Sequence, residues 1–148
     1  MRTRKNIRLT DYDYRQNGLY FVTICSQNKR PIFGTIQHAQ IHLTPIGQKI
    51  QQTFREYGQK YPDITIPQLL IMPNHIHAII HFLGTKNTAR MKLGQFINLC
   101  KGQASRACQK SIWQRGYYEH VIRHEKDLLK IMEYIENNPR KWEEQHRH

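Results

Sequence analysis

Residues 64–82, ITIPQLLIMPNHIHAIIHF, predict the centre of a β-sheet. Two runs rich in β-branched and other apolar residues, Ile64 to Met72 and His75 to Phe82, are separated by the turn residues Pro73 and Asn74. Each run has the length of an ordinary strand. The stretch therefore predicts two neighbouring strands joined by a tight connection, with two histidines at the start of the second.

The second run has two chemically different faces, because successive side chains of a strand point to opposite sides. One face is apolar and consists of Ile76, Ala78, Ile80 and Phe82. The other face consists of His75, His77, Ile79 and His81. Neighbouring Cα atoms on one face lie about 6.6 Å apart, a span that two imidazoles can close around one metal ion or one phosphate. We expect the apolar face to pack on the core and the histidine pair to mark a site.

The composition favours a polyanionic partner. The chain has 148 residues, enough for one ordinary domain, and its 23 Lys and Arg against 11 Asp and Glu give a net charge of +12 and a pI near 9.9. Each phosphate that such cations neutralise releases a condensed counterion, so nucleic acid is the first expectation. An acidic membrane surface ranks behind it, because no apolar run approaches about 18 residues.

The N-terminus and the cysteines indicate a cytoplasmic protein. Residues 1–14, MRTRKNIRLTDYDY, are basic, but no apolar segment follows, so we expect no secretory signal. Cys25, Cys100 and Cys108 form no C-x-x-C pair, which is in line with reduced thiols and no zinc knuckle. With the predicted nucleic-acid partner, this gives a cytoplasmic, nucleoid-associated protein.

The remaining sequence predicts an α+β domain of the ferredoxin-like kind. Thr44 and Pro45 can begin a helix whose apolar stripe is formed by Ile46, Ile50, Phe54 and Tyr57. Two further helices are predicted, from Thr88 to Lys110 and from Glu125 to Asn138, the second ended by Pro139. Besides the two central runs, strands are predicted at Gly18 to Gln27, at its short partner Ile32 to Gln37, and at Tyr117 to Arg123.

The resulting order, β-β-α-β-β-α-β-α, suggests a mainly antiparallel sheet packed with three helices. We expect a single domain over residues 1–148, with a basic N-terminal arm at 1–10 and a C-terminal tail at 140–148.

The last predicted helix contains candidate partners for the histidines. Its core stripe is Leu128, Ile131, Met132 and Ile135. Tyr134 and Asn138 are four residues apart beside that stripe, so they lie one turn apart on the same side. A tyrosine hydroxyl and an amide oxygen near the histidine pair would supply a nucleophile and a third metal ligand.

Three motifs give the sequence a resemblance to a known family. They are RLTDYDYRQNGLYFVTICSQNKRPIFG at 8–34, LLIMPNHIHAII at 69–80 and IWQRGYYEHVIRHEKDLLKIMEYIENNPRKW at 112–142. Together and in this order, the chain resembles the REP-associated tyrosine transposases, members of the HUH single-tyrosine, IS200-like group, in which U is a bulky apolar residue. By that resemblance His75 and His77 bind the metal, Tyr134 is the nucleophile, and Asn138 is the third ligand, where many relatives of the insertion-sequence branch carry glutamine.

The resemblance implies a metal-dependent transposase that cleaves and rejoins single-stranded DNA at imperfect repeat hairpins through a 5′-phosphotyrosine intermediate. A phenol is a poor nucleophile at neutral pH, so a nearby cation must favour the phenolate and withdraw charge from the phosphate. Two neutral imidazoles and one amide leave a divalent ion its charge and its open coordination sites. We therefore expect Mg or Mn rather than a closed tetrahedral zinc site.

Several basic residues are candidates for DNA contacts. They are Arg2, Arg4, Lys5 and Arg8 in the N-terminal arm, and Lys101 and Arg106 in the basic predicted helix. The arm can also be read as a solvated tail. Three residues could contact the metal ligands from outside the coordination sphere: His81, Glu119 and His120.

Alternatives remain open at this stage. Tyr117 and Tyr118 are other candidate nucleophiles, but they fall in a predicted strand without an amide four residues later, which favours core or base-stacking roles. For Trp113 and Trp142, packing within the protein is favoured over stacking on nucleobases. The protein could also be a domesticated hairpin-binding protein with little or no catalysis, or an RNA-binding module that uses its sheet for stacking. Both a monomer and a homodimer fit, and the resemblance favours the monomer.

Overall fold

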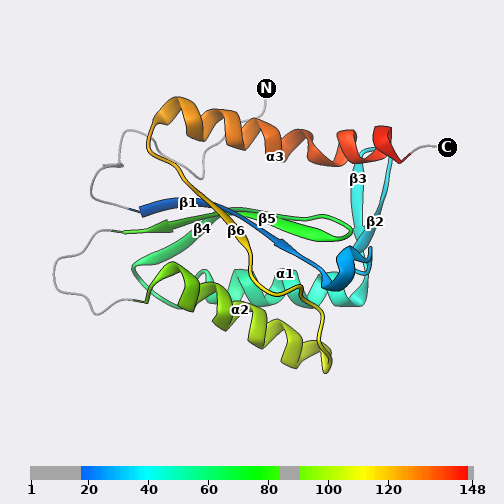
Figure 1. The fold of residues 1–148 in the computed structure, drawn as a ribbon, viewed down its shortest axis with the longest axis horizontal. Helices are drawn as coiled ribbons and strands as arrows, with labels where there is room; N and C mark the ends of the chain where they lie inside the picture. The colour runs from blue at the N-terminus through cyan, green and yellow to red at the C-terminus, as the bar shows by residue number, and fades with distance from the viewer. Residues whose placement is uncertain (1–17, 84–90, 147–148) are drawn as a thin grey trace.

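The computed structural model describes residues 18–83 and 91–146, which form an antiparallel sheet covered by helices (Figure 1). The strands of this sheet are β1 (Gly18–Cys25), β4 (Ile64–Ile71), β5 (His75–Phe82) and β6 (Tyr118–Val121). Their spatial order is β4-β5-β1-β6, so β5 has a hydrogen-bonded neighbour on each side. The strand that carries the histidine pair is therefore fixed in register by both neighbours.

Three helices cover the two faces of the sheet. They are α1 (Pro45–Tyr57), α2 (Leu93–Cys108) and α3 (Glu125–Gln145). Helices α1 and α2 lie on one face, and α3 runs across the other (Figure 1). The predicted α+β class, with a mainly antiparallel sheet and three helices, is confirmed. No helix in residues 18–83 or 91–146 is long and apolar enough to span a membrane.

Each face of the sheet has its own apolar cluster, and the larger one lies under α1 and α2. This cluster includes Ile76, Ala78, Ile80 and Phe82 of β5, as the alternation predicts. The other face is also buried, because Ile79 packs with Leu19 of β1 and with Leu128, Met132 and Ile135 of α3. The histidine face is thus not a solvent face, and α3 covers much of it.

Helix α1 begins where the sequence predicts. Thr44 is its N-cap, and the side-chain oxygen accepts a hydrogen bond from the backbone N–H of Gly47 at 3.1 Å. Pro45 occupies the first helical position, where its missing N–H costs nothing. Ile50 and Phe54 of the predicted stripe are fully buried, which fixes α1 against the sheet.

The prediction that residues 32–37 pair with the first strand is wrong. Strand β2 (Gly34–Gln37) pairs instead with β3 (Gln40–Leu43), which the sequence reading missed, in a separate two-stranded sheet. The turn between them consists of His38 and Ala39, whose φ angles are 54° and 59°. Two successive left-handed residues form the tight turn that suits a hairpin, but glycine or asparagine normally signals it. Here neither is present, so the local signal was missing.

The prediction that the last helix ends at Pro139 is also wrong. Helix α3 continues through Pro139 to Gln145, into the region expected to be a tail. A proline inside a helix removes one hydrogen bond and crowds the preceding turn. The cost is offset by a contact beyond the proline, since the carboxylate of Glu143 accepts hydrogen bonds from the backbone N–H groups of His38 and Ala39.

The other element boundaries differ slightly from the predictions. Helix α2 begins at Leu93, where the side chain of Gln95 accepts a hydrogen bond from the backbone N–H of Lys92 at 2.8 Å. The predicted start at Thr88 lies outside the described residues. So do the N-terminal arm and its four candidate DNA contacts, Arg2, Arg4, Lys5 and Arg8.

Candidate active site

The histidine pair stands at the beginning of β5, where β1 lies beside it. Cys25 pairs with His75, and Thr23 pairs with His77. The two imidazole centroids are 4.6 Å apart. Residues that pair directly across antiparallel strands point to the same face, so Thr23 and Cys25 belong to the same surface as the histidines. The sheet register thus builds a small polar patch from two strands.

Each histidine is oriented by a neighbouring oxygen atom at its Nδ1. For His75 this atom is Oδ1 of Asn74, at 2.7 Å, and for His77 it is Oγ1 of Thr23, at 3.0 Å. When these oxygens accept from Nδ1–H, the lone pair of each ring resides on Nε2. Nε2 of His77 is buried and makes no hydrogen bond to any described residue. A buried ring nitrogen with no protein partner is available to bind a metal ion.

Burial keeps both imidazoles neutral at physiological pH. The pKa of His77 is lowered to about 3, mainly by burial and secondarily by a positive charge on His75, while the amide of Asn138 opposes the shift. Burial also lowers the pKa of His75, with the Asn138 amide opposing and the charge of Lys29 contributing to the lowering. The amide approaches both rings without forming a well-shaped hydrogen bond to Nε2 of His77. Neutral imidazoles are the form that binds a metal.

Helix α3 brings Tyr134 and Asn138 to the histidines. The ring centroid of Tyr134 lies 5.5 Å from that of His77 and 6.2 Å from that of Phe21. Tyr134 is 47% exposed, while Asn138, one turn later, is 9% exposed. The hydroxyl of a half-exposed tyrosine is accessible to a large substrate, and a buried amide can coordinate an ion. The four residues singled out from the sequence therefore meet in one place.

These residues line a cavity of about 630 Å³. Its wall also includes the cations Lys29 and Lys141 and the aromatic residues Tyr118 and Trp142. The ring of Trp142 lies 6.3 Å from that of His75 and is stacked on that of His146, at 4.0 Å and 12°. Cations and aromatic faces around a polar floor suit a nucleic-acid strand, whose phosphates and bases need both.

The end of α3 contributes residues that the sequence reading missed. Lys141, Gln145 and His146 line the cavity, as does Trp142, for which packing alone was favoured. The signal was present, because positions 134, 138, 141, 142 and 145 share one face of a continuous helix. A helix that ends at Pro139 excludes the positions after 139 from this face, which is why the prediction missed them. Thr23 was missed for another reason, since its role depends on the pairing between β1 and β5.

The three candidates for supporting the ligands are placed differently. His81 is buried on the same sheet face as His77, but it lies four residues further along β5 and does not line the cavity, and burial lowers its pKa. His120 also lies on that face, but its Nε2 is 2.8 Å from Asp127 of α3, an exposed ion pair away from the cavity. Glu119 pairs with Val22 and so points to the opposite face. None of the three lines the cavity, and their supporting role stays a prediction.

The two candidate DNA contacts of α2 also differ. Arg106 is exposed, and its predicted contact stays a prediction. Lys101 is 9% exposed, and its ammonium donates hydrogen bonds to the carbonyl oxygens of Gln114 and Gly116 at 3.1 and 3.0 Å. Burial lowers the pKa of Lys101. This position disfavours the predicted phosphate contact, because the cation already holds the loop that follows α2.

The alternative nucleophiles Tyr117 and Tyr118 lie on opposite sides of the sheet. Tyr117 packs against the apolar cluster under α1 and α2, and burial, together with Glu119, raises its pKa. A raised pKa disfavours the phenolate. Tyr118 pairs with Thr23, is 61% exposed and lines the histidine cavity. It is therefore the one rival to Tyr134 among the tyrosines named from the sequence.

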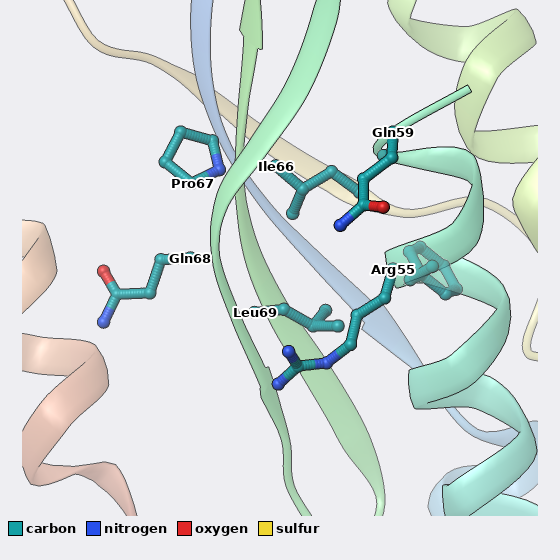
Figure 2. Close-up of a pocket in the computed structure, with 8 residues that line it drawn as sticks. Arg55, Gln59, Ile66, Pro67, Gln68 and Leu69 are labelled. Carbon is teal, nitrogen blue, oxygen red and sulfur yellow. The ribbon is translucent and has the colours of Figure 1, made fainter. Parts of the chain in front are cut away.

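A separate hollow of about 380 Å³ lies between α1 and β4, where Leu69 and Ile66 face Arg55 and Gln59 (Figure 2). Leu69 pairs with Ala78, so this hollow is on the face opposite the histidines. It contains no tyrosine, histidine or carboxylate. We therefore assign the chemistry to the histidine cavity.

No group of three His, Cys, Asp or Glu that could hold a metal occurs in residues 18–83 or 91–146. An ion would instead be bound by His75, His77 and the amide oxygen of Asn138. The donor set fits a divalent ion, since both rings are neutral and Nε2 of His77 is without a partner. Two imidazoles and one amide also leave open positions for phosphate oxygens.

The chain is similar to known proteins. The family model described as "Transposase IS200 like" matches residues 22–138, which include both histidines, the tyrosine and the asparagine. An uncharacterized protein of Haemophilus influenzae is 36% identical to this chain, with 95% of the chain and 91% of the relative covered. The REP-associated tyrosine transposase of Escherichia coli K12 is 27% identical, with 85% of this chain and 68% of the relative covered.

A solved structure is also similar. It is a REP-associated tyrosine transposase bound to a REP hairpin, with a TM-score of 0.65, 27% sequence identity, and 84% of this chain and 67% of that chain covered. The resemblance inferred from the three sequence motifs is thus confirmed. Because the family match extends over well more than half of the residues, the chain belongs to the IS200-like transposase family.

Proposed function

We propose that this chain is a DNA strand transferase that cleaves and rejoins single-stranded DNA beside an imperfect hairpin, with Tyr134 as the nucleophile. The observation that carries the proposal is the 5.5 Å separation between the ring centroids of Tyr134 and His77, within one cavity that also contains His75 and Asn138. A half-exposed phenol beside two neutral imidazoles suits a nucleophile better than a core residue.

His75, His77 and Asn138 would hold a divalent ion, Mg²⁺ or Mn²⁺. Such an ion, when bound, supplies positive charge that favours the phenolate and withdraws charge from the phosphate. The other residues of the site orient the ligands and add positive charge. Thr23 and Asn74 keep the two rings oriented through their Nδ1 atoms. Lys29 and Lys141 add positive charge to the cavity wall where a phosphate would enter.

The reaction follows from the nature of the nucleophile. The phenol oxygen of Tyr134 loses its proton and attacks the phosphorus atom, a bond forms between them, and the bond from phosphorus to the 3′ oxygen breaks. The 3′ oxygen takes up a proton and leaves as a free hydroxyl. The 5′ end stays attached to the protein as a phosphotyrosine, so a 3′-hydroxyl can reverse the step and join strands without ATP.

The substrate class rests on the comparisons and on charge. One similar structure has a REP hairpin bound, and one relative is named a REP-associated tyrosine transposase. The net charge of +12 suits a polyanion. A backbone phosphate reaches a cavity of this size more easily from an unpaired strand than from a duplex. The residues of the site come from one chain, so we propose that a monomer suffices, acting at the DNA of the nucleoid.

Covalent trapping tests the proposal. The protein is incubated with Mn²⁺ and a hairpin oligonucleotide that carries a single-stranded extension and a label on the 3′ side of the cleavage point, and then denatured. We expect a labelled protein band, absent in Tyr134→Phe and present in Tyr118→Phe, which separates the two candidate phenols. An RNA copy of the hairpin should give no band. A wild-type protein that binds the hairpin without forming the band would identify a binding protein that has lost its chemistry.

A further inference from the structure

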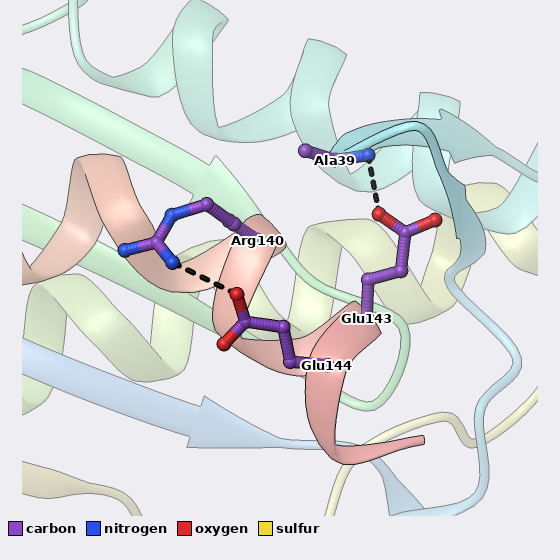
Figure 3. Close-up of polar contacts among 4 residues, drawn as sticks. All are labelled: Ala39, Arg140, Glu143 and Glu144. Atoms are coloured by element: carbon purple, nitrogen blue, oxygen red, sulfur yellow. Dashed lines mark hydrogen bonds and ion pairs between the residues drawn. The ribbon is translucent and has the colours of Figure 1, made fainter. Parts of the chain in front are cut away.

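Glu143 connects two parts of the chain that are far apart in sequence. Its carboxylate oxygens accept hydrogen bonds from the backbone N–H groups of His38, at 2.9 Å, and Ala39, at 2.8 Å. Figure 3 shows the second bond, between the end of α3 and the turn of the β2–β3 hairpin. Two charge-assisted hydrogen bonds to adjacent N–H groups fix a carboxylate in both position and orientation.

The connection is made at the part of α3 that most needs support. Pro139 has no N–H to donate to the preceding turn, so residues 140–145 are tied to the rest of α3 by fewer backbone hydrogen bonds. Helix α3 contacts both β2 and β3, and Glu143 supplies hydrogen bonds at that contact. The hairpin therefore holds the last turns of α3 in place.

These last turns form one wall of the histidine cavity. Lys141 and Trp142 line it, whereas Glu143 does not. The indole of Trp142 is tilted by 45° toward the ring of His75, at 6.3 Å between centroids. His146, four residues later, stacks on one face of this indole at 4.0 Å and 12°, so a planar ring fits flat there, and a nucleobase that binds at this face replaces the imidazole. A nucleobase is such a ring, and stacking on an aromatic side chain needs no particular base.

We propose, building on the function above, that Trp142 stacks on a nucleobase of the substrate strand next to the phosphate under attack. Glu143 is the positioning residue that keeps Trp142 there, through the turn of His38 and Ala39. The hairpin of β2 and β3 thus contributes to substrate binding without touching the substrate. Base stacking on one aromatic side chain changes binding by about tenfold.

The neighbouring residue provides a matched control. Glu144 also carries a carboxylate in the same helical turn, but it pairs with Arg140 at 2.9 Å, four residues earlier and in an exposed position (Figure 3). Glu143→Ala and Glu144→Ala therefore remove the same charge from the same turn. Only the first also breaks the connection to the hairpin.

The two tryptophans of the chain give a direct readout. With 5-fluorotryptophan incorporated, ¹⁹F NMR resolves Trp142 from Trp113, and Trp142→Phe assigns the signals. On addition of the hairpin oligonucleotide with its single-stranded extension, we expect the Trp142 signal to move and the Trp113 signal to stay. In Glu143→Ala the Trp142 response should need about tenfold more oligonucleotide, and in Glu144→Ala it should be unchanged. Trp142→Ala should weaken binding as much as Glu143→Ala, and Trp142→Phe should restore most of it.

A second variant separates positioning from hairpin stability. The double substitution of His38→Gly and Ala39→Gly makes both left-handed positions of the turn favourable, so the hairpin depends less on the carboxylate for its backbone conformation. If Glu143→Ala still weakens binding in that background, the carboxylate acts on α3, as proposed. If the loss disappears, Glu143 only stabilises the hairpin and the proposal is wrong.

These outcomes are independent of catalysis. A protein that forms no covalent band, but whose Trp142 signal responds to the oligonucleotide in a Glu143-dependent way, contradicts the proposed chemistry and supports the positioning role. A protein that forms the band, but in which Trp142 does not respond or Glu143→Ala behaves like Glu144→Ala, contradicts the positioning role and leaves the chemistry standing.

Discussion

The two faces of strand β5 are built from adjacent residues and do different work. Ile76, Ala78, Ile80 and Phe82 are buried in the large apolar cluster with α1 and α2. His75 and His77, which alternate with them, face α3 and form the floor of a cavity. Both faces are covered by helices, and the polar cavity with the histidines lies on the α3 face.

This difference explains how a chain of this size can keep a polar site rigid. Close packing on the α1 and α2 face holds the backbone of β5, and the same backbone sets the positions of the imidazoles on the other face. Burying the rings also keeps them unprotonated. The comparison predicts that substitutions on one face change stability and that substitutions on the other change chemistry.

The largest expected effect is that of His77→Ala on covalent-adduct formation. A metal ion contributes several kcal/mol of charge stabilisation, so losing a ligand should lower the rate by about a thousandfold or more. Circular dichroism should show an intact fold, because the imidazole adds no apolar contact to the large cluster. An adduct formed at the wild-type rate in the presence of Mn²⁺ would show that His77 is not a ligand.

Ile80→Ala should have the opposite profile. Ile80 is fully buried on the α1 and α2 face, and truncation there removes apolar contacts and leaves a cavity. We expect the free energy of unfolding in urea to fall by about 2–5 kcal/mol. At temperatures where the variant is fully folded, adduct formation per molecule should stay within about threefold of wild type. A large loss of activity without loss of stability would break the distinction between the faces.

Acid should destabilise the metal-free protein through the histidine face. Burial lowers the pKa of His77 in the folded state to about 3, whereas in the unfolded chain it is near 6.5. Between these values only the unfolded state binds the proton, so this contribution to stability is complete above about pH 6.5 and is lost as the pH falls toward 3. Urea unfolding with EDTA at a series of pH values measures the slope. His77→Ala should reduce the slope, and an equal slope in both proteins would contradict the assignment.

Thr23→Val should give the smallest of these effects. The substitution keeps the shape of the side chain but removes the oxygen 3.0 Å from Nδ1 of His77. Partners that orient a metal-binding histidine typically contribute a factor of about 10 to 100 in metal affinity. Titration with Mn²⁺, followed by electron paramagnetic resonance of the free ion, measures the change. Thr23→Ser, which keeps the hydroxyl, should bind nearly as well as wild type.

Local signals in the sequence predicted the elements whose boundaries depend on neighbouring residues. Thr44 and Pro45 mark the start of α1 by capping chemistry, and the alternation from His75 to Phe82 marks β5. Tyr134 and Asn138 were paired correctly by helical spacing, and the family resemblance pointed to the same residues. In each case the information lies within a few residues of the feature that it predicts.

Features that depend on distant contacts were missed. The hairpin of β2 and β3 has no glycine or asparagine in its turn, and its two left-handed residues donate hydrogen bonds to Glu143, about a hundred positions away. The same contact offsets the cost of Pro139. Lys101 was predicted to meet DNA because it is a cation on a basic helix. Its burial follows from the path of the loop at Gln114 and Gly116, which no local pattern reveals.

The lowered pKa values of His75 and His77 affect the heat of metal binding. A histidine that is partly protonated must release its proton when a metal ion binds, and the heat measured then depends on the ionisation enthalpy of the buffer. These two rings carry no proton to release near pH 7. Titration of the protein with Mn²⁺ near pH 7 should therefore give the same enthalpy in cacodylate as in organic buffers of high ionisation enthalpy.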